Sequence, residues 1–265
     1  IWNLGGYPSP KNWISYLNDD TTSGGMSDRG DLYSGGQLGQ SFAGMPKSTD
    51  TSFTGPPYVY FVGGQHSGFR DNIQYFDGTT TSGNSADGGD ISYGLSQGGA
   101  IAGFQYGFIL GGYTSNSGVG GTNVLFRIDT NTTNSGFAAT DSGDLIWAGR
   151  AWCSGLGGYD GSEIGNVAGG YNGSVQNTNI QYLDLASSTG DTIDKGDLTL
   201  VRGWNSLVSG DSNFIMMGGH DGSRSVAQTQ YWDISTSSVN ASNHGSDINA
   251  QTHGPGSGAG YSGLT

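Results

Sequence analysis

The stretch QYLDLASSTGDTIDKGDLTLVRGW, residues 181–204, places a strand-like aromatic segment, a turn of small residues and a second strand-like segment in immediate succession. The second segment contains Gly196-Asp197-Leu198, and variants of this tripeptide occur five times in the chain. The intervals between their aspartates are 59, 54, 53 and 50 residues, for Asp31, Asp90, Asp144, Asp197 and Asp247. A period of this kind that fills all 265 residues predicts five structural repeats in a single domain.

Each repeat carries three further segments with strand-like composition. The first is an apolar run closed by Gly-Gly, typical of a buried strand: 1–6, 58–64, 106–112, 165–170 and 213–219. The second is an aromatic segment with period-two alternation: 13–19, 72–78, 123–130, 179–185 and 229–235. The third is a glycine-rich stretch that follows Gly-Asp-Leu: 35–44, 94–103, 154–160, 205–211 and 254–263.

Four strands in each of five repeats predict an all-β fold, a five-bladed β-propeller with four antiparallel strands per blade. We expect the glycine-rich strand to be innermost, because only small residues fit where five strands converge. The chain ends on a glycine-rich segment and begins on an apolar one, so N- and C-terminal strands are expected to share a blade and close the ring. The expected repeat units are 33–91, 92–145, 146–198, 199–248, and a closing blade of 249–265 plus 1–32.

The composition limits the classes of partner. Charged residues are 12% of the chain and the net charge is −13, with nine Lys and Arg in total, so we expect no basic surface for nucleic acid. No apolar run approaches the ~18 residues of a transmembrane helix, and no membrane insertion is expected.

The repeat resembles the kelch repeat, in which an apolar Gly-Gly strand, a loop and a Tyr-Asp-type strand precede an Arg. The similarity is closer to kelch-like proteins of tailed bacteriophages, especially marine ones, and is strongest over residues 160–235. The matching residues are Gly169-Gly170, Asn179-Ile180-Gln181-Tyr182, Thr189-Gly190, Gly196-Asp197-Leu198-Thr199 and Arg202. The resemblance implies a structural component of the virion, without indicating capsid decoration, baseplate or tail fibre.

The five repeated aspartates are the most prominent carboxylates. A residue that recurs once per blade is better explained by a hydrogen bond to backbone N–H groups at a turn or strand entry than by catalysis. The enzyme alternative is a glycosidase, which would need paired carboxylates facing each other across the axis. Glu163 is the only glutamate, so both catalytic roles would fall largely to Asp.

No metal site or cofactor is expected. The four histidines, His66, His220, His244 and His253, lack the spacing of metal ligands. Segments rich in Asp and Asn, such as 17–25 and 129–136, lack the regular spacing of a Ca²⁺ loop and are interpreted as turns.

Binding residues are expected where the repeats differ, in the loops after Gly-Gly, because variable loops on a rigid frame usually carry function. The candidates are Tyr7, Gln65, His66, Phe69, Arg70, Tyr113, Tyr171, His220, Asp221 and Arg224. An insertion at 45–57 is a candidate docking arm.

The sequence therefore favours a non-enzymatic structural or attachment protein on the surface of a phage particle. Its expected partners are other virion proteins and a host-surface glycan. The alternatives are a free lectin-like carbohydrate-binding propeller and a glycosidase that uses axial Asp residues.

Overall fold

The computed structural model describes residues 2–4, 13–16, 26–32, 41–44, 58–64, 68–78, 80–96, 98–103, 106–114, 121–129, 139–147, 154–157, 163–203, 205–209, 212–245 and 248. Within these residues the chain is all-β and forms five small antiparallel sheets. Strands follow one another in each sheet in chain order, as the repeat predicts.

The first sheet has three strands: β1 (Trp2–Leu4), β2 (Trp13–Tyr16) and β3 (Ser27–Asp31). The second contains β4 (Ser41–Gly44), β5 (Tyr58–Val62), β6 (Arg70–Asp77) and β7 (Ala86–Leu95). The third contains β8 (Gly99–Ala102), β9 (Tyr106–Tyr113), β10 (Gly121–Asp129) and β11 (Thr140–Asp144). The fourth contains β12 (Ser154–Gly157), β13 (Ile164–Ala168), β14 (Asn177–Asp184) and β15 (Ile193–Arg202). The fifth contains β16 (Ser206–Ser209), β17 (Asn213–Met217), β18 (Thr229–Asp233) and β19 (Ser242–Asn243).

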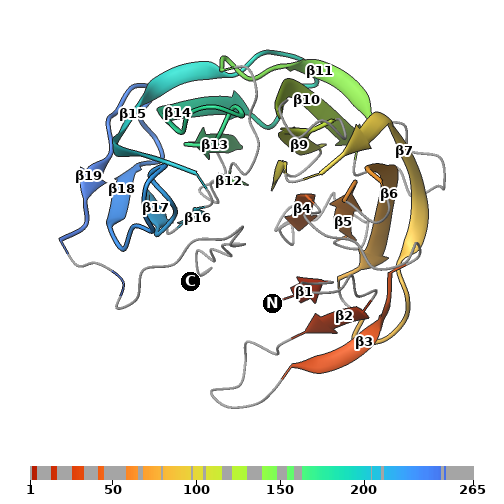
Figure 1. Cartoon of the computed structure of the whole chain (residues 1–265). Helices are drawn as coiled ribbons and strands as arrows, with labels where there is room; N and C mark the ends of the chain where they lie inside the picture. The colour runs from red at the N-terminus through yellow and green to blue at the C-terminus, as the bar shows by residue number, and fades with distance from the viewer. Residues whose placement is uncertain are drawn as a thin grey trace.

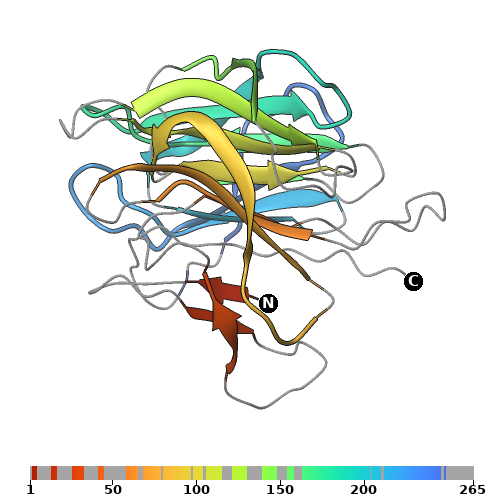
Figure 2. The same ribbon diagram turned by 90° about the vertical axis from the view of Figure 1, so that its right-hand side faces the viewer.

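The five sheets lie around a common centre, with β4, β8, β12 and β16 on the inner side and β7, β11, β15 and β19 on the outer side (Figure 1). The inner strands are those of the glycine-rich stretches, where the sequence predicts them. Turned by 90°, the same strands are seen stacked sheet upon sheet, with β1–β3 at one end (Figure 2). The contact expected to close the ring, between residues 249–265 and the first sheet, lies outside the described residues.

The core consists of apolar layers between successive sheets. Ile14 and Leu32 of the first sheet pack against Phe61 and Phe76 of the second, and equivalent clusters fill the next three interfaces. A middle strand is therefore covered on both faces, which explains why Tyr58–Val62 is a continuous apolar run and not an alternating one.

The Gly-Asp tripeptide lies at a β-bulge in the outer strand of each of the first four sheets. In the fourth sheet Ile180 opposes Gly196 while Gln181 opposes Asp194, so Lys195 is the extra residue. The same register shift makes Arg29, Gly88 and Ser142 the extra residues of the other three bulges. All four extra residues are buried. The bulge thus places one buried residue per sheet at the interface with the next sheet, and this residue carries a side chain in three of the four sheets.

Each described bulge is stabilised by an aspartate two residues before its glycine. The carboxylates of Asp28, Asp87, Asp141 and Asp194 each accept a hydrogen bond from the glycine N–H, at 3.1–3.2 Å. The repeated motif is therefore Asp-x-Gly-Asp, longer than the tripeptide from which the period was read.

The main chain of the second aspartate binds the β-turn of the next sheet. Asp197 N donates to Asn240 Oδ1 at 2.9 Å, and Ala241 N donates to Asp197 O at 2.8 Å. The same pair of bonds joins Asp144 to the turn containing Asp191, and Asp31 to the turn containing Asn84. We call this arrangement the bulge–turn latch.

The structure corrects two features of the predicted repeat boundaries. Gly89-Asp90-Ile91 lies inside β7 and Gly196-Asp197-Leu198 inside β15, so the boundaries at 91/92 and 198/199 cut through strands. In the fifth sheet Gln230 opposes Asn243, as Gln181 opposes Asp194. This register aligns Gly245 with Gly196. An alignment of Asp247 with Asp197 would instead match Ser246 to Gly196, which is one residue later.

Candidate functional site

The described members of the repeated aspartate set lie on the outer strands, away from the common centre of the sheets (Figure 1). The side chains of Asp31, Asp90, Asp144 and Asp197 are exposed. Their expected carboxylate bond to backbone N–H is made instead by the aspartate three residues earlier, because the bulge reverses the alternation of side chains. Asp247 lies outside the described residues.

The local environment of these carboxylates differs from repeat to repeat. Partial burial raises the pKa of Asp144, and the charges of Asp191 and Asp141 add to the shift. Burial likewise raises the pKa of Asp90, with Asp71 and Asp87 as the charged neighbours.

The predicted binding residues fall into three groups. Tyr7, Gln65 and His66 lie outside the described residues, as does the insertion at 45–57. Phe69 and Arg70 are half-buried where β6 begins, and Arg70 N donates to Gly64 O at 2.9 Å. The remaining residues lie on or beside the loops that connect the second and third strands of the third to fifth sheets.

Tyr113 differs from the expectation of a loop residue. It ends β9, is only 8% exposed, and exchanges two backbone hydrogen bonds with Ser96, at 2.7 and 3.0 Å. Burial raises the pKa of its phenol, with a further contribution from neighbouring Tyr171. The strand continues through Gly111-Gly112 because the chain entering the third sheet pairs with it, a long-range contact that the local sequence does not reveal.

Two short loops share one backbone design. Residues 171–176 and 220–225 are each closed by a bridge between the first and last residue, Tyr171 with Gln176 and His220 with Ser225. In the first loop Asn172 Oδ1 accepts bonds from Ser174 N and Val175 N, at 3.0 and 2.9 Å.

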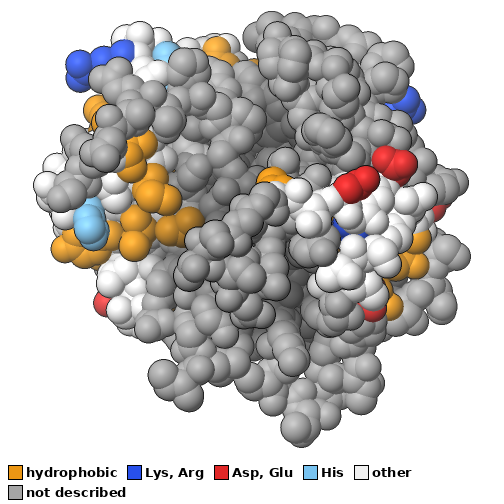
Figure 3. All heavy atoms as spheres, turned by 90° about the horizontal axis from the view of Figure 1, so that it is seen from below, with side chains coloured by type: hydrophobic (Ala, Val, Ile, Leu, Met, Phe, Trp, Pro, Cys, Tyr) orange, Lys and Arg blue, Asp and Glu red, His pale blue; other side chains and the backbone are white. Residues whose placement is uncertain are grey.

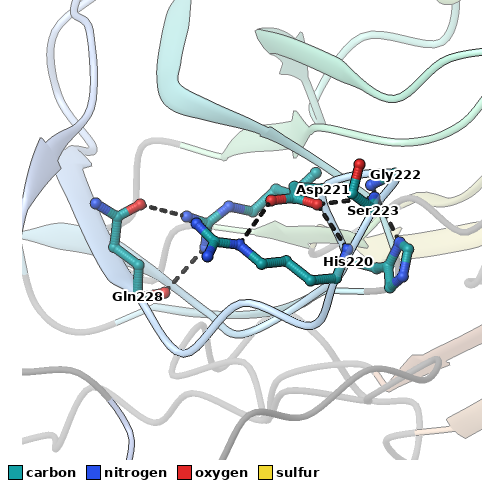
Figure 4. Close-up of polar contacts among 7 residues, drawn as sticks. His220, Asp221, Gly222, Ser223 and Gln228 are labelled. Atoms are coloured by element: carbon teal, nitrogen blue, oxygen red, sulfur yellow. Dashed lines mark hydrogen bonds and ion pairs between the residues drawn. The ribbon is translucent and has the colours of Figure 1, made fainter.

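Asp221 plays the same part in the second loop. Its Oδ1 accepts bonds from Ser223 N and Arg224 N, both at 2.9 Å, and Arg224 Nε lies 3.4 Å from Oδ2 (Figure 4). These backbone bonds lower the pKa of Asp221, so it is ionised at neutral pH. His220 Nδ1 accepts a bond from Gly222 N at 3.1 Å, which assigns the proton of the neutral ring to Nε2.

The second loop is anchored by a buried arginine from the preceding sheet. Arg202 donates to Gly218 O and Gln228 O, both at 3.0 Å, and to Gln228 Oε1 at 2.8 Å. Gln228 and the two loop residues His220 and Asp221 are seen together in Figure 4. The Arg that ends the repeat therefore positions a candidate binding loop.

The two loops contact each other. A Cβ atom on Gly222 would lie 2.7 Å from Gln176 Oε1, so the second loop packs against the last residue of the first. Their outermost side chains are exposed and chemically different: Val175 is 51% exposed and the Arg224 side chain 77%. The surface offers tyrosine, amide, carboxylate, imidazole and guanidinium groups within two adjacent loops.

Other classes of site find limited support in the described residues. No three His, Cys, Asp or Glu side chains of this part of the chain gather as metal ligands. Lys and Arg side chains are scattered on the face shown in Figure 3. Among the residues that the structure describes, no helix is long and apolar enough to span a bilayer.

A scan of the sequence against models of protein families gives no match, and a search of curated proteins gives no significant similarity.

Proposed function

We propose that the chain is a closed five-bladed, kelch-like β-propeller that serves as a non-enzymatic structural or attachment protein of a virion. The four-stranded sheets around a common centre, each packed on the next, support the propeller. The resemblance of the repeat to kelch-like phage proteins supports a location in the virion, where the chain would be a component of the capsid decoration, baseplate or tail fibre.

The observation that carries the binding role is the pair of loops with the same backbone and different tips. Asn172 and Asp221 form the same turn, while Tyr171 is replaced by His220 and Val175 by Arg224. A frame that is kept constant while its exposed side chains vary is the usual design of a recognition surface.

The partners are other virion proteins and a host-surface glycan. Tyr and His rings suit stacking on a sugar, and the amides and carboxylate of these loops suit hydrogen bonds to hydroxyl groups. The same residues suit a protein rim, since interfaces of this kind are polar and hydrated.

Cryo-electron microscopy of the native particle tests the proposal. The expected result is ring-shaped density on the particle surface that contacts unlike chains through one face. Particles that lack the ring, with the protein recovered only as a soluble monomer, would contradict it.

A second candidate is a free lectin, favoured by the contact between the Gln176 and Gly222 loops. Glycan-array binding by the isolated chain, lost in Y171A and H220A and kept in V175A, would support the lectin. The glycosidase alternative is less favoured, because the described repeat aspartates lie on outer strands. Hydrolysis of aryl glycosides by the purified chain, abolished by a single Asp→Asn change, would restore it.

A further inference from the structure

The three bulge–turn latches whose turns are described differ in what fills the space beside them. At the first interface Arg29, the extra residue of the bulge in β3, enters the turn of the second sheet. It donates to Asp77 O and Thr80 O at 3.1 Å and to Thr80 Oγ1 at 2.6 Å, and also bonds Gly83 O. Its guanidinium carbon lies 4.0 Å from the centroid of the Phe76 ring.

The interface between the fourth and fifth sheets is filled in the same way. Lys195, only 1% exposed, donates from Nζ to Ile234 O at 3.0 Å. Burial lowers the pKa of Lys195, and the charge of Asp233 opposes part of this shift. Asp233 belongs to the terminal residue pair of β17 and β18, as Asp77 does in β5 and β6. A cation from one sheet thus enters the turn of the next.

At the interface between the third and fourth sheets the bulge supplies no such cation. The extra residue of the bulge in β11 is Ser142, whose Oγ donates to Leu125 O at 3.3 Å within its own sheet. A pocket of about 280 Å³ lies here, between Phe108 on one side and the turn of the fourth sheet on the other. Ile193, which lines it, is 59% exposed, so the pocket opens to solvent.

Four residues that line this pocket are equivalent by position to second-sheet residues that surround Arg29. Strand register and the shared sequence align Leu183 with Phe76 and Asp184 with Asp77. Counting along the two turns from these positions aligns Ser187 with Thr80 and Gly190 with Gly83, and all four fourth-sheet residues line the pocket.

The two turns also have matching geometry. A Cβ on Gly30 would lie 2.5 Å from Gly83 O and 2.8 Å from Asn84 Oδ1. The corresponding distances from Gly143 are 2.5 Å to Gly190 O and 2.9 Å to Asp191 Oδ1. Beside the latch the turns of the second and fourth sheets therefore have the same geometry, and the fourth sheet receives no arginine from the bulge. The hydroxyl groups differ, because Thr80 Oγ1 donates to Asp77 O whereas Ser187 Oγ donates to Thr189 O.

The charge of the pocket points to the same type of ligand. Asp191 replaces the Asn84 and Asn240 of the other two latches, so the pocket is lined by two carboxylates, Asp184 and Asp191. The nearest basic side chain from the third sheet, Arg127, donates to Ser188 O at 2.8 Å and stacks 4.7 Å from the Tyr106 ring centroid. Ser188 aligns with Thr81, which Arg29 does not bind, so Arg127 does not take the place of Arg29.

We propose that this pocket is a binding site for an external guanidinium group. The pocket is slightly below the usual range of about 300–1,000 Å³ for ligand pockets, which fits one side chain or a small cation and not a cofactor. The guanidinium is carried either by a free small molecule or by an arginine side chain of a partner polypeptide.

The test uses methylguanidinium as the probe and its uncharged isostere methylurea as the control. Two-dimensional NMR of the whole chain should show saturable methylguanidinium-dependent shifts at the amides of residues 187–193, with methylurea at least tenfold weaker. Equal shifts with methylurea, or none at these residues, would overturn the proposal.

Three variants separate binding in the pocket from nonspecific attraction of a cation to the acidic surface. S142R should fill the pocket from within, as Arg29 does, and weaken methylguanidinium binding at least tenfold, whereas S142A should bind as the parent does. R29S should open an equivalent pocket in the second sheet, adding shifts at residues 80–86. Unchanged binding in S142R, with shifts retained at 187–193, would refute the site.

The source of the guanidinium is distinguished by comparing agmatine with the peptide acetyl-Gly-Arg-Gly-amide. Tighter binding of the peptide identifies an arginine of a partner polypeptide. Tighter binding of agmatine identifies a small molecule.

Discussion

The interface between the first and second sheets and the interface between the third and fourth share the bulge–turn latch and differ in the extra residue of the bulge. Both latches join the main chain of an Asp to an Asx residue of the next turn, at 2.9 and 2.8 Å. Arg29 fills the space beside the first latch, and Ser142 leaves a pocket beside the second. The comparison teaches that the latch fixes how sheets meet, whereas the extra residue of the bulge decides whether the interface is filled.

The largest expected effect comes from emptying the filled interface. R29A removes hydrogen bonds to Asp77, Thr80 and Gly83 and the contact with Phe76. Because the group is charged, buried and hydrogen-bonded, we expect a loss of about 3 kcal/mol in the free energy of unfolding. Thermal denaturation should show a fall in Tm of roughly 6–12 °C for a domain of this size.

The matched control is R127A, which removes an arginine with a single hydrogen bond to Ser188 O. Its expected cost is about 1 kcal/mol. If both variants lose the same stability, filling by the extra bulge residue is not what distinguishes the two interfaces.

The next largest expected loss of stability comes from a substitution that disturbs only the bulge–turn latch. G143A adds a Cβ at φ +145° only 2.5 Å from Gly190 O, whereas G190A adds one at φ +141° with no atom within 4 Å. Both variants carry backbone strain of about 1–2 kcal/mol, and G143A should cost a further ~1–2 kcal/mol for the clash. Urea denaturation of the pair measures the difference. Equal midpoints would show that the latch can relax.

Features that depend on neighbouring residues could be predicted from the sequence, whereas features that depend on contacts between distant residues could not. In the four sheets with four described strands, the strand segments and the inner position of the glycine-rich strand followed from local composition, because buried strands and turns have local signatures. The bulge could not be predicted in this way, because an alternating pattern does not indicate that Lys195 has no residue opposite it on the neighbouring strand. Asp194 and its three equivalents were visible at the same period and were the signal that was missed.

The candidate site was less predictable for the same reason. Sequence placed His220 and Asp221 in a loop after Gly-Gly, and the structure places them there. It also placed Tyr113 in a loop, although pairing with Ser96 buries that residue. The guanidinium pocket had no local signature, because it depends on Ser142 of one sheet facing Asp184 and Gly190 of another.

A smaller effect concerns the interface filled by a lysine. Burial lowers the pKa of Lys195 to about 8, while an unfolded Lys titrates near 10.4. Between these values the unfolded chain binds more protons, so this group makes stability rise with pH across that window and contributes no slope below about pH 8. Relative to K195M, the parent should therefore gain a few degrees in Tm from pH 8 to 10.

The comparison with K195M cancels the titration of tyrosines, which is common to both proteins. A Tm difference that is constant or falls over this window would show that Lys195 is not desolvated as its burial indicates.

The smallest effect comes from giving the latch between Asp144 and Asp191 an asparagine, as in the other two described latches. D191N keeps the oxygen that accepts from Asp144 N, as Asn84 and Asn240 do. We expect a change in stability within about 0.5 kcal/mol. The pKa of Asp144 should fall, because Asp191 contributes to its elevation after burial. Carbon-detected NMR titration of the Asp144 carboxyl measures this, and an unchanged value would exclude the coupling.

The shared design of the loops at 171–176 and 220–225 has a consequence for how such a protein evolves. The bonds that shape each loop use the main chain and one Asx side chain, so Val175 and Arg224 are not required for the turn. Under the proposed binding role, mutations of these two side chains therefore alter binding and leave the fold of each loop unchanged. A lineage whose partner changes could then vary this surface rapidly while the loop backbone is inherited unaltered.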